Sequence, residues 1–209
     1  MRIPVAREGW PFIVPPAAAA CILALVGRWA TAIPFAVVAG AFLGFFRDPE
    51  RTTPRMPGGL VAPADGKVME VALVDDRWVG PAAVRLSIFL SPLDVHVNRA
   101  PMAGVVRDVE YARGRFLAAY RPEASDVNER CTLLLEGDQG RVAVRQIAGV
   151  LARRIVCRVE RGDKLEVGQR FGMIRFGSRT DLIAPRSADV RVAVGARVRG
   201  GETIMAVLR

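Results

Sequence analysis

The sequence has little lysine, histidine or cysteine, and each shortage argues against a class of chemistry. Among 30 basic residues only Lys67 and Lys164 are lysines, so a pyridoxal enzyme, which needs a lysine Schiff base, is a weak option and no pyridoxal phosphate is expected. The three cysteines, Cys21, Cys131 and Cys157, are widely spaced and form no CxxC motif. This spacing argues against a zinc site or a disulfide framework. We therefore expect no metal and a reducing, cytosolic setting.

The positive charge of the chain is almost entirely arginine. The 209 residues carry a net charge of +9, and arginine binds phosphate groups in a bidentate manner without losing its proton. No nucleic-acid recognition motif accompanies this charge, and the few aromatic residues are concentrated in the N-terminal apolar region. An anionic membrane therefore fits the charge better than a nucleic acid does.

Two apolar runs occupy the N-terminus, from Pro11 to Gly27 and from Ala30 to Phe46, with one arginine between them. Each would span roughly 26 Å as a helix, slightly less than a hydrocarbon core of ~30 Å. Basic residues flank both outer ends, which favours placing both ends in the cytoplasm. The sequence therefore predicts a membrane-associated apolar helical hairpin over residues 1–46, on the cytoplasmic face of the cell membrane, followed by a second domain over residues 47–209.

Three prolines, Pro15, Pro16 and Pro34, weaken regular helices in this hairpin and leave a re-entrant or interfacial arrangement open. A cleaved signal peptide fits less well, because the apolar region is double and no small-residue cleavage site follows it.

Beyond residue 59 the pattern changes to β-branched, alternating segments separated by Gly- and Asp-rich breaks. Expected strands cover residues 61–74, 83–90, 104–111, 131–135, 141–147, 155–158, 170–175 and 190–194. Only residues 148–153 and 116–120 have a locally helical pattern. The segments 162–169 and 196–203 are near repeats of one turn design, the kind seen in barrel-sandwich lipoyl or biotinyl carrier domains. We therefore predict a mainly β, barrel-sandwich domain with minor helices, without the lysine that such carriers modify.

A Gly-Ser turn at Gly177 and Ser178 lies among these strands and is a candidate site of self-cleavage. A serine hydroxyl held against the preceding carbonyl can convert the amide into an ester, and elimination and hydrolysis would then leave a pyruvoyl group. Gly177 has no Cβ to shield its carbonyl. The same dipeptide is also among the commonest turn sequences, so by itself it favours a simple loop.

Further motifs occur in a fixed order around this turn. They are Phe46-Arg47-Asp48-Pro49-Glu50-Arg51, Ala62-Pro63-Ala64-Asp65-Gly66-Lys67-Val68, Phe89-Leu90-Ser91-Pro92-Leu93-Asp94-Val95-His96-Val97-Asn98-Arg99, Asn128-Glu129-Arg130 and Phe176-Gly177-Ser178. From about residue 45 to the C-terminus the chain resembles the phosphatidylserine decarboxylases, in particular their short prokaryotic branch. Two departures stand out. Arg179 follows the serine where many relatives have threonine, and Arg99 stands where the longer branch has a second histidine.

The resemblance implies an Asp65-His96-Ser178 relay, in which the acid orients the imidazole and the imidazole activates the serine. His96 is the only histidine in the chain. Asp94 is the rival for the acid role, but residues two apart on an extended chain face the same way without necessarily touching. The resemblance also implies that Asn128, Glu129 and Arg130 help to bind the substrate.

A self-processing decarboxylase of phosphatidylserine is the function that the resemblance implies. Its chains would be residues 1–177 (β) and 178–209 (α), and a pyruvoyl group on Ser178 would form a Schiff base with the substrate amine. Two alternatives remain open: a decarboxylase of the archaeal ether lipid with the same serine headgroup, and a membrane-tethered β domain that binds lipid without chemistry. A homodimer is also compatible with the resemblance.

Overall fold

The computed structural model describes residues 4–121, 123–150, 154–175 and 178–209. The chain divides into two compact units, Met1–Glu50 and Arg51–Arg209. The first unit is helical and the second is mainly β, as the sequence predicts.

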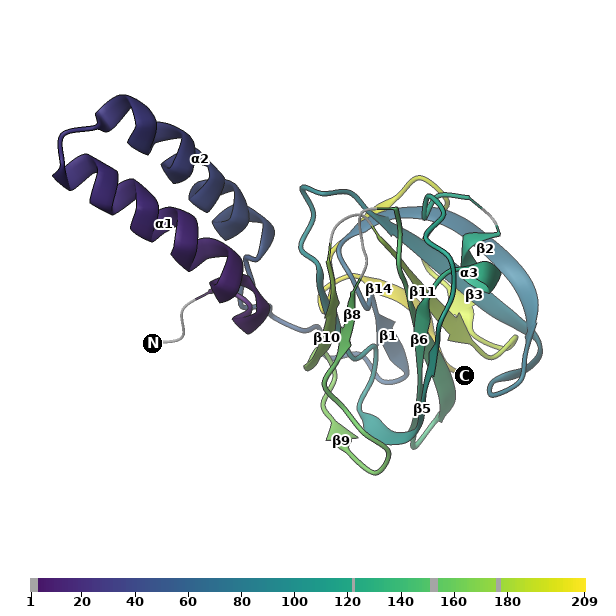
Figure 1. Cartoon of the computed structure of the whole chain (residues 1–209). Helices are drawn as coiled ribbons and strands as arrows, with labels where there is room; N and C mark the ends of the chain where they lie inside the picture. The colour runs from purple at the N-terminus through teal and green to yellow at the C-terminus, as the bar shows by residue number, and fades with distance from the viewer. Residues whose placement is uncertain (1–3, 122, 151–153, 176–177) are drawn as a thin grey trace. The chain divides into compact units, whose positions relative to one another are not determined.

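The first unit is an antiparallel helical hairpin (Figure 1). A short 3-10 helix, η1 (Arg7–Gly9), leads into α1 (Trp10–Leu25), and α2 (Trp29–Phe45) returns beside it. Phe12 stacks on Phe46 near the open end, with ring centroids 5.4 Å apart. Many large apolar side chains of both helices remain exposed, among them Leu25 and Trp29 next to the turn. The segment Arg7–Leu25 is long and apolar enough to cross a membrane, whereas Trp29–Phe45 is shorter.

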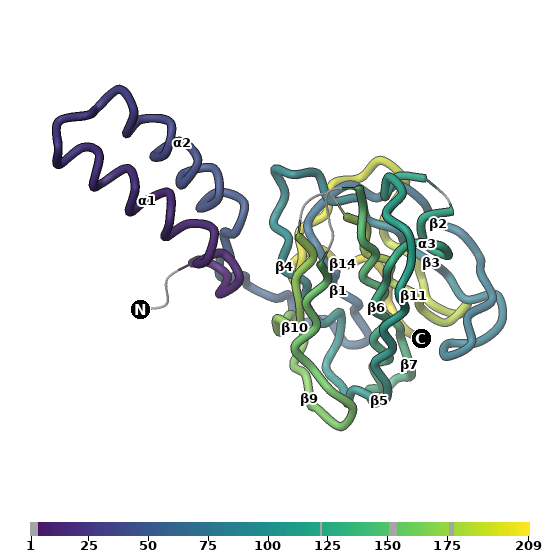
Figure 2. Tube along the Cα trace, viewed as in Figure 1, coloured from purple at the N-terminus to yellow at the C-terminus, as the bar shows by residue number. Residues whose placement is uncertain are grey.

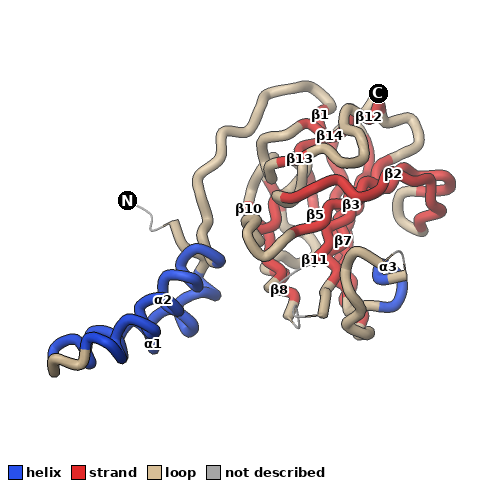
Figure 3. Tube along the Cα trace, turned by 90° about the horizontal axis from the view of Figure 1, so that it is seen from above, coloured by secondary structure: helices blue, strands red, loops and turns tan. Residues whose placement is uncertain are grey.

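An eight-stranded antiparallel sheet forms most of the second unit. Its strands are, in spatial order, β13 (Arg197–Val198), β2 (Gly66–Asp76), β3 (Gly80–Leu90), β11 (Ser178–Ala184), β7 (Gly140–Ile147), β6 (Arg130–Gly137), β5 (Gly104–Ala112) and β9 (Lys164–Leu165). The sheet is curled, as views from two directions show (Figures 1 and 3). Its inner face packs on a single apolar core, because alternate residues of each strand, such as Leu86 and Ile88 of β3, point inward.

Two small sheets complete this unit (Figure 2). The first contains β1 (Gly59–Val61), β14 (Ile204–Val207) and β12 (Asp189–Val190). The second contains β4 (Val97–Arg99), β10 (Arg170–Ile174) and β8 (Ile155–Cys157).

The near-repeated segments lie at the two edges of the large sheet, where they contribute β9 and β13. Their turns meet, since a Cβ built at Gly201 would lie only 3.7 Å from the Cα of Gly168. Each turn binds a neighbouring segment in the same way: the Gly168 amide donates to Ala100, and the Gly201 amide donates to Ala62. The repeats thus bring the edges of the curled sheet together.

The local expectations were wrong in four places, one of which is the strand expected over residues 190–194: only Val190 of that range belongs to a strand, β12. The strand expected over residues 61–74 is broken between β1 and β2, because Pro63 has no amide hydrogen and Gly66 adopts a φ of +150°. Residues 116–120 are not helical, and the short helix of this region is α3 (Ala124–Val127), on the outer side of the sheet. The helix expected over 148–153 is absent from residues 148–150, and residues 151–153 lie outside the described part of the chain.

Candidate active site

Ser178 is the first residue of β11 and is fully buried. It lies opposite Leu90 of β3, and the next residue, Arg179, lies opposite both Phe89 of β3 and Ile147 of β7. The Oγ atom of Ser178 has no hydrogen-bond partner among the described residues. Gly177, the other residue of the expected cleavage site, lies outside them. A buried hydroxyl without a partner is costly, so Ser178 Oγ is a group that needs a functional explanation.

His96 reaches the same corner of the domain through a second connection. Residues 91–96 lead from Leu90, the partner of Ser178, to β4, while residues 175–177 lead from Ile174 to Ser178. The amide of Ile174 donates to the carbonyl of His96 at 3.3 Å. Both connections therefore join the large sheet to the small sheet of β4 and β10. Their ends are neighbours, because Leu90 pairs with Ser178 and β4 pairs with β10. The described neighbours of His96 and of Ser178 thus lie at one corner of the domain, although 82 positions separate the two residues in the sequence.

The imidazole of His96 is fully buried, and its Nδ1 lies 2.9 Å from the backbone oxygen of Asp94. A carbonyl oxygen can only accept, so Nδ1 carries a hydrogen and Nε2 is the basic nitrogen of the neutral ring. The Asp94 carboxylate itself accepts bonds from the amide and hydroxyl of Ser91, at 2.8 and 2.7 Å. Asp94 therefore folds the turn before His96 and orients its ring through the main chain.

Asp65 lies in the break between β1 and β2. One carboxylate oxygen accepts the Gly200 amide at 2.7 Å, and the other accepts Arg51 Nη2 at 2.8 Å. Its segment runs beside the one that carries His96, because the Arg99 amide donates to Pro63 at 2.9 Å. The structure thus places Asp65 in the neighbourhood of His96, with its carboxylate also tied to the turn of the second near repeat.

A chain of buried amides lies beneath this corner. Asn98 Nδ2 donates to Thr180 Oγ1 at 3.1 Å, and Gln146 Nε2 donates to Asn98 Oδ1 at 2.9 Å. Thr180 lies two residues after Ser178, on the same face of β11, and the Gln146 oxygen has no partner among the described residues. Sequence reasoning missed Gln146. The available signal was a single amide side chain in the otherwise apolar inward pattern Val142, Val144, Gln146.

Arg179, on the opposite face of β11, is fully buried. Its guanidinium donates to Asp181 at 2.6 Å, to Ser87 at 2.6 Å and to Glu70 at 3.0 Å. Asp181 also accepts the hydroxyl of Ser125 from α3, at 3.1 Å. Arg179 therefore anchors β11 to β2 and β3, and its side chain lies in the interior of the protein.

The triplet at 128–130 shapes the neighbouring loop. Asn128 donates both amide hydrogens, to Leu117 and Ala148, each at 2.8 Å, which leaves none for a substrate. Glu129 accepts the hydroxyl of Tyr111, and burial followed by this bond raises the pKa of Tyr111. Arg130 Nη1 binds the carbonyl of Asp126 at 2.7 Å.

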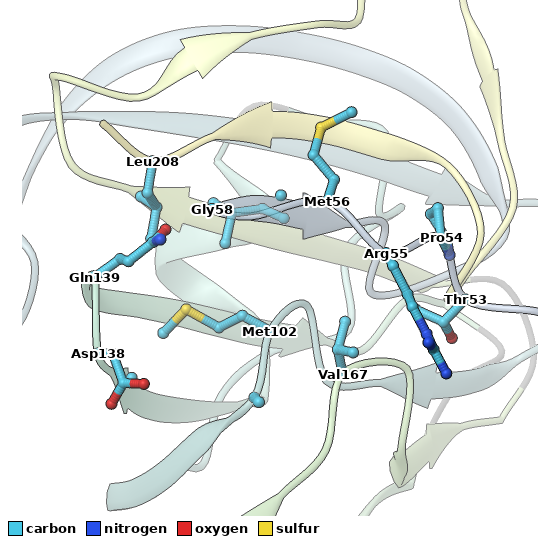
Figure 4. A pocket seen from close by; sticks show the side chains of 14 residues that line it. Thr53, Pro54, Arg55, Met56, Gly58, Met102, Asp138, Gln139, Val167 and Leu208 are labelled. Carbon is cyan, nitrogen blue, oxygen red and sulfur yellow. The ribbon is translucent and has the colours of Figure 1, made fainter.

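A cavity of about 440 Å³ lies at the other end of the β6–β7 hairpin from Ser178 (Figure 4). Met56 and Met102 line it, Arg55 lies on one side, and Asp138 and Gln139 lie on the other (Figure 4). Within the described part of the chain no three His, Cys, Asp or Glu residues cluster as metal ligands would.

Comparison with known proteins identifies a family. The model of the phosphatidylserine decarboxylase family matches residues 38–206. A phosphatidylserine decarboxylase proenzyme of Symbiobacterium thermophilum is 50% identical over 208 residues, which cover 98% of this chain and 96% of that protein. Proenzymes of the same description from Nitrosomonas eutropha (43% identical, 98% of this chain and 95% of that protein) and Nocardia farcinica (47%, 98% and 88%) are also similar over nearly the full length.

Proposed function

This chain belongs to the phosphatidylserine decarboxylase family, and we propose that Ser178 is the residue at which it cleaves itself and on which its pyruvoyl group forms. The enzyme is a pyruvoyl-dependent decarboxylase that converts phosphatidylserine into phosphatidylethanolamine and CO₂. The observation that carries the assignment is the Ser178 hydroxyl, fully buried and without a partner among the described residues, at the corner that also holds His96.

Self-cleavage begins with the Ser178 hydroxyl, which attacks the carbonyl carbon of Gly177. The C–N bond breaks, an ester bond to Oγ forms, and the nitrogen of Ser178 becomes an amine. Removal of the Cα proton then expels the ester as a carboxylate, which ends the β chain at residue 177. Residue 178 is left as dehydroalanine, and water replaces its nitrogen, released as ammonia, to give the pyruvoyl group.

His96 is the base that we assign to the first of these steps. Because the Asp94 carbonyl holds the hydrogen on Nδ1, Nε2 is the atom that accepts the Ser178 proton. The same carbonyl then stabilises the protonated ring. We also assign Asp65 a role in orienting His96. The support is that the segment of Asp65 lies beside the segment that carries both His96 and Asn98.

The residues around Ser178 suit a pyruvoyl group, which needs a small buried site at the end of a fixed strand. When present, this group supplies a carbonyl that binds the substrate amine and withdraws the electron pair left by departing CO₂. Arg179 holds the backbone next to it through the buried Asp181 and Ser87 and the half-buried Glu70. His96 handles the proton that returns to the substrate carbon.

Cleavage would leave the two chains interlocked. The α chain, residues 178–209, contributes β11 between β3 and β7 of the β chain, and also β14 beside β1 and β13 beside β2. A strand paired on both sides exchanges slowly, so we expect the α and β chains to remain together without a covalent link.

We further propose that the first unit holds the enzyme at the cytoplasmic face of an anionic membrane, where its substrate lies. The support is the exposed apolar surface of α1 and α2 together with the basic residues at their outer ends.

Mass spectrometry of the purified chain tests the cleavage site. The wild type should give residues 1–177 and an N-terminally blocked chain 178–209, whereas Ser178→Ala should remain one inactive chain, since no ester can form. Ser178→Thr and Ser178→Cys should cleave slowly at best. The exposed Ser187 offers a matched control, and Ser187→Ala should cleave like the wild type. Two chains from Ser178→Ala would refute the assignment.

A further inference from the structure

Two cysteines that are far apart in the sequence meet in the fold. Cys131 lies in β6 of the large sheet and is buried, and Cys157 ends β8 of a small sheet and is half-buried. The two strands contact each other. The cross-strand neighbour of Cys131 is Gln146, whose amide nitrogen lies 3.4 Å from the carbonyl of Val156. Independent contacts of neighbouring residues therefore place the two thiols together.

The two cysteines differ in solvent exposure and in the pKa of the thiol. A hydrogen bond from the Cys131 thiol, opposed by burial and aided by the backbone at Val159, lowers the pKa of Cys157 to about 7. The same bond and burial raise the pKa of Cys131. Cys157 is therefore the thiol of the pair that ionises more readily to the thiolate, the form that reacts with electrophiles, while Cys131 keeps its proton.

We propose that Cys131 and Cys157 form a redox-active pair that a hydroperoxide converts into an intramolecular disulfide. The Cys157 thiolate attacks one oxygen of hydrogen peroxide, the O–O bond breaks, and Cys157 becomes a sulfenic acid. The other oxygen leaves as hydroxide, which takes up the proton that Cys157 released on ionisation and becomes water. Cys131 then attacks the Cys157 sulfur, the S–O bond breaks, and the hydroxyl group leaves as water with the Cys131 proton. Two thiols and one peroxide thus give one disulfide and two waters.

The disulfide would join the two sheets that build the candidate active site. β6 belongs to the large sheet that carries Ser178, while β8 pairs with β10, which pairs with β4 just after His96. A disulfide needs its sulfurs ~2.05 Å apart, closer than two hydrogen-bonded thiols, so its formation draws β8 toward β6. The proposal itself concerns the thiol pair and does not depend on the catalytic roles assigned above.

Cys21 supplies an internal control because it is an exposed thiol in the helical unit, away from the pair in the sequence. The full-length protein in detergent is treated with hydrogen peroxide, remaining thiols are alkylated, and unreduced peptides are weighed. We expect a peptide pair that joins residues 131 and 157, two hydrogens lighter than the reduced peptides and separated by dithiothreitol. Cys21→Ser should give the same cross-link at the same rate.

Single variants separate the two roles. Cys131→Ala should lose the cross-link and accumulate a Cys157 sulfenic acid that dimedone traps, whereas Cys157→Ala should leave Cys131 as a thiol at the same peroxide dose. Folding of each variant is checked by its self-cleavage, which neither thiol serves. Sulfinic acid on wild-type Cys157 without a cross-link, or peroxide reaction confined to Cys21, would overturn the proposal.

Discussion

The backbone carbonyl of Asp94 decides which nitrogen of His96 can act as a base. Because Nδ1 donates to that carbonyl, Nε2 is the nitrogen that can accept and release protons at the site. His96 is the only histidine, and Arg99 stays protonated and donates to the carbonyl of Gly168 at 3.1 Å. A single imidazole therefore serves this site.

We expect His96→Ala to cleave itself much more slowly than the wild type and to remain nearly inactive once processed. General acid–base help is worth about 10²–10⁴-fold, so turnover per pyruvoyl group should fall by that order. Self-cleavage needs only one turnover, so long incubation should still yield both chains. The measurements are chain masses over days and CO₂ release per processed molecule.

His96→Gln is the matched variant, because its side chain fills similar space and keeps an N–H donor but has no basic nitrogen. It should be as slow as His96→Ala. Wild-type turnover by either processed variant would show that His96 is a structural residue.

At the scale of elements, β11 is the strand that carries the site, and Arg179 fixes its outer face. Removing one partner of a buried ion pair leaves the other charge buried without compensation and lowers the free energy of unfolding by ~3–5 kcal/mol. Replacing both partners with apolar groups often leaves the stability unchanged. In a Ser178→Ala background, which stays one chain, Arg179→Met should lower the free energy of unfolding by that amount. Adding Asp181→Leu should recover most of it. Urea midpoints of the single and double variants give the coupling.

The exposed pair of Arg141 and Glu136 offers a comparison on the same sheet, since these side chains are 2.9 Å apart but Arg141 is 56% exposed. Arg141→Met should lower the urea midpoint far less than Arg179→Met does, because water screens an exposed pair. Equal losses at Arg141 and Arg179 would mean that the buried network does not hold β11.

The elements themselves were predictable where the sequence pattern is local. Alternation marks the long strands, and the double apolar run marks the helical hairpin. The break at Pro63 and the coil over residues 116–120 were missed, because main-chain and Asn128 contacts from distant segments decide them. The pairing of Cys131 with Cys157 and the place of Gln146 depend on how two sheets pack, which no local pattern reveals. The relay between His96 and Ser178 stays a prediction, and it rests on the ordered motifs of the family.

At the scale of the whole molecule, the chemistry and the apolar hairpin belong to different units. Every residue placed at the site lies after Glu50, including Arg51, which binds both Asp65 and Glu202. The hairpin, in contrast, exposes apolar side chains and carries none of these groups. We therefore expect the first unit to bring the enzyme to the lipid and the second unit to carry out the catalysis.

Deletion of residues 1–46 should therefore leave a domain that folds and cleaves itself, but that acts poorly on lipid vesicles. The expected loss is in access to substrate, so turnover of a dispersed short-chain phosphatidylserine should stay near that of the full chain, and sedimentation with anionic vesicles should decrease. Trp29→Glu, at an exposed position beside the hairpin turn, is the milder control and should weaken vesicle binding without affecting cleavage. A truncated protein that is folded yet remains one chain would place the hairpin inside the catalytic domain and move the boundary that we assign at residue 46.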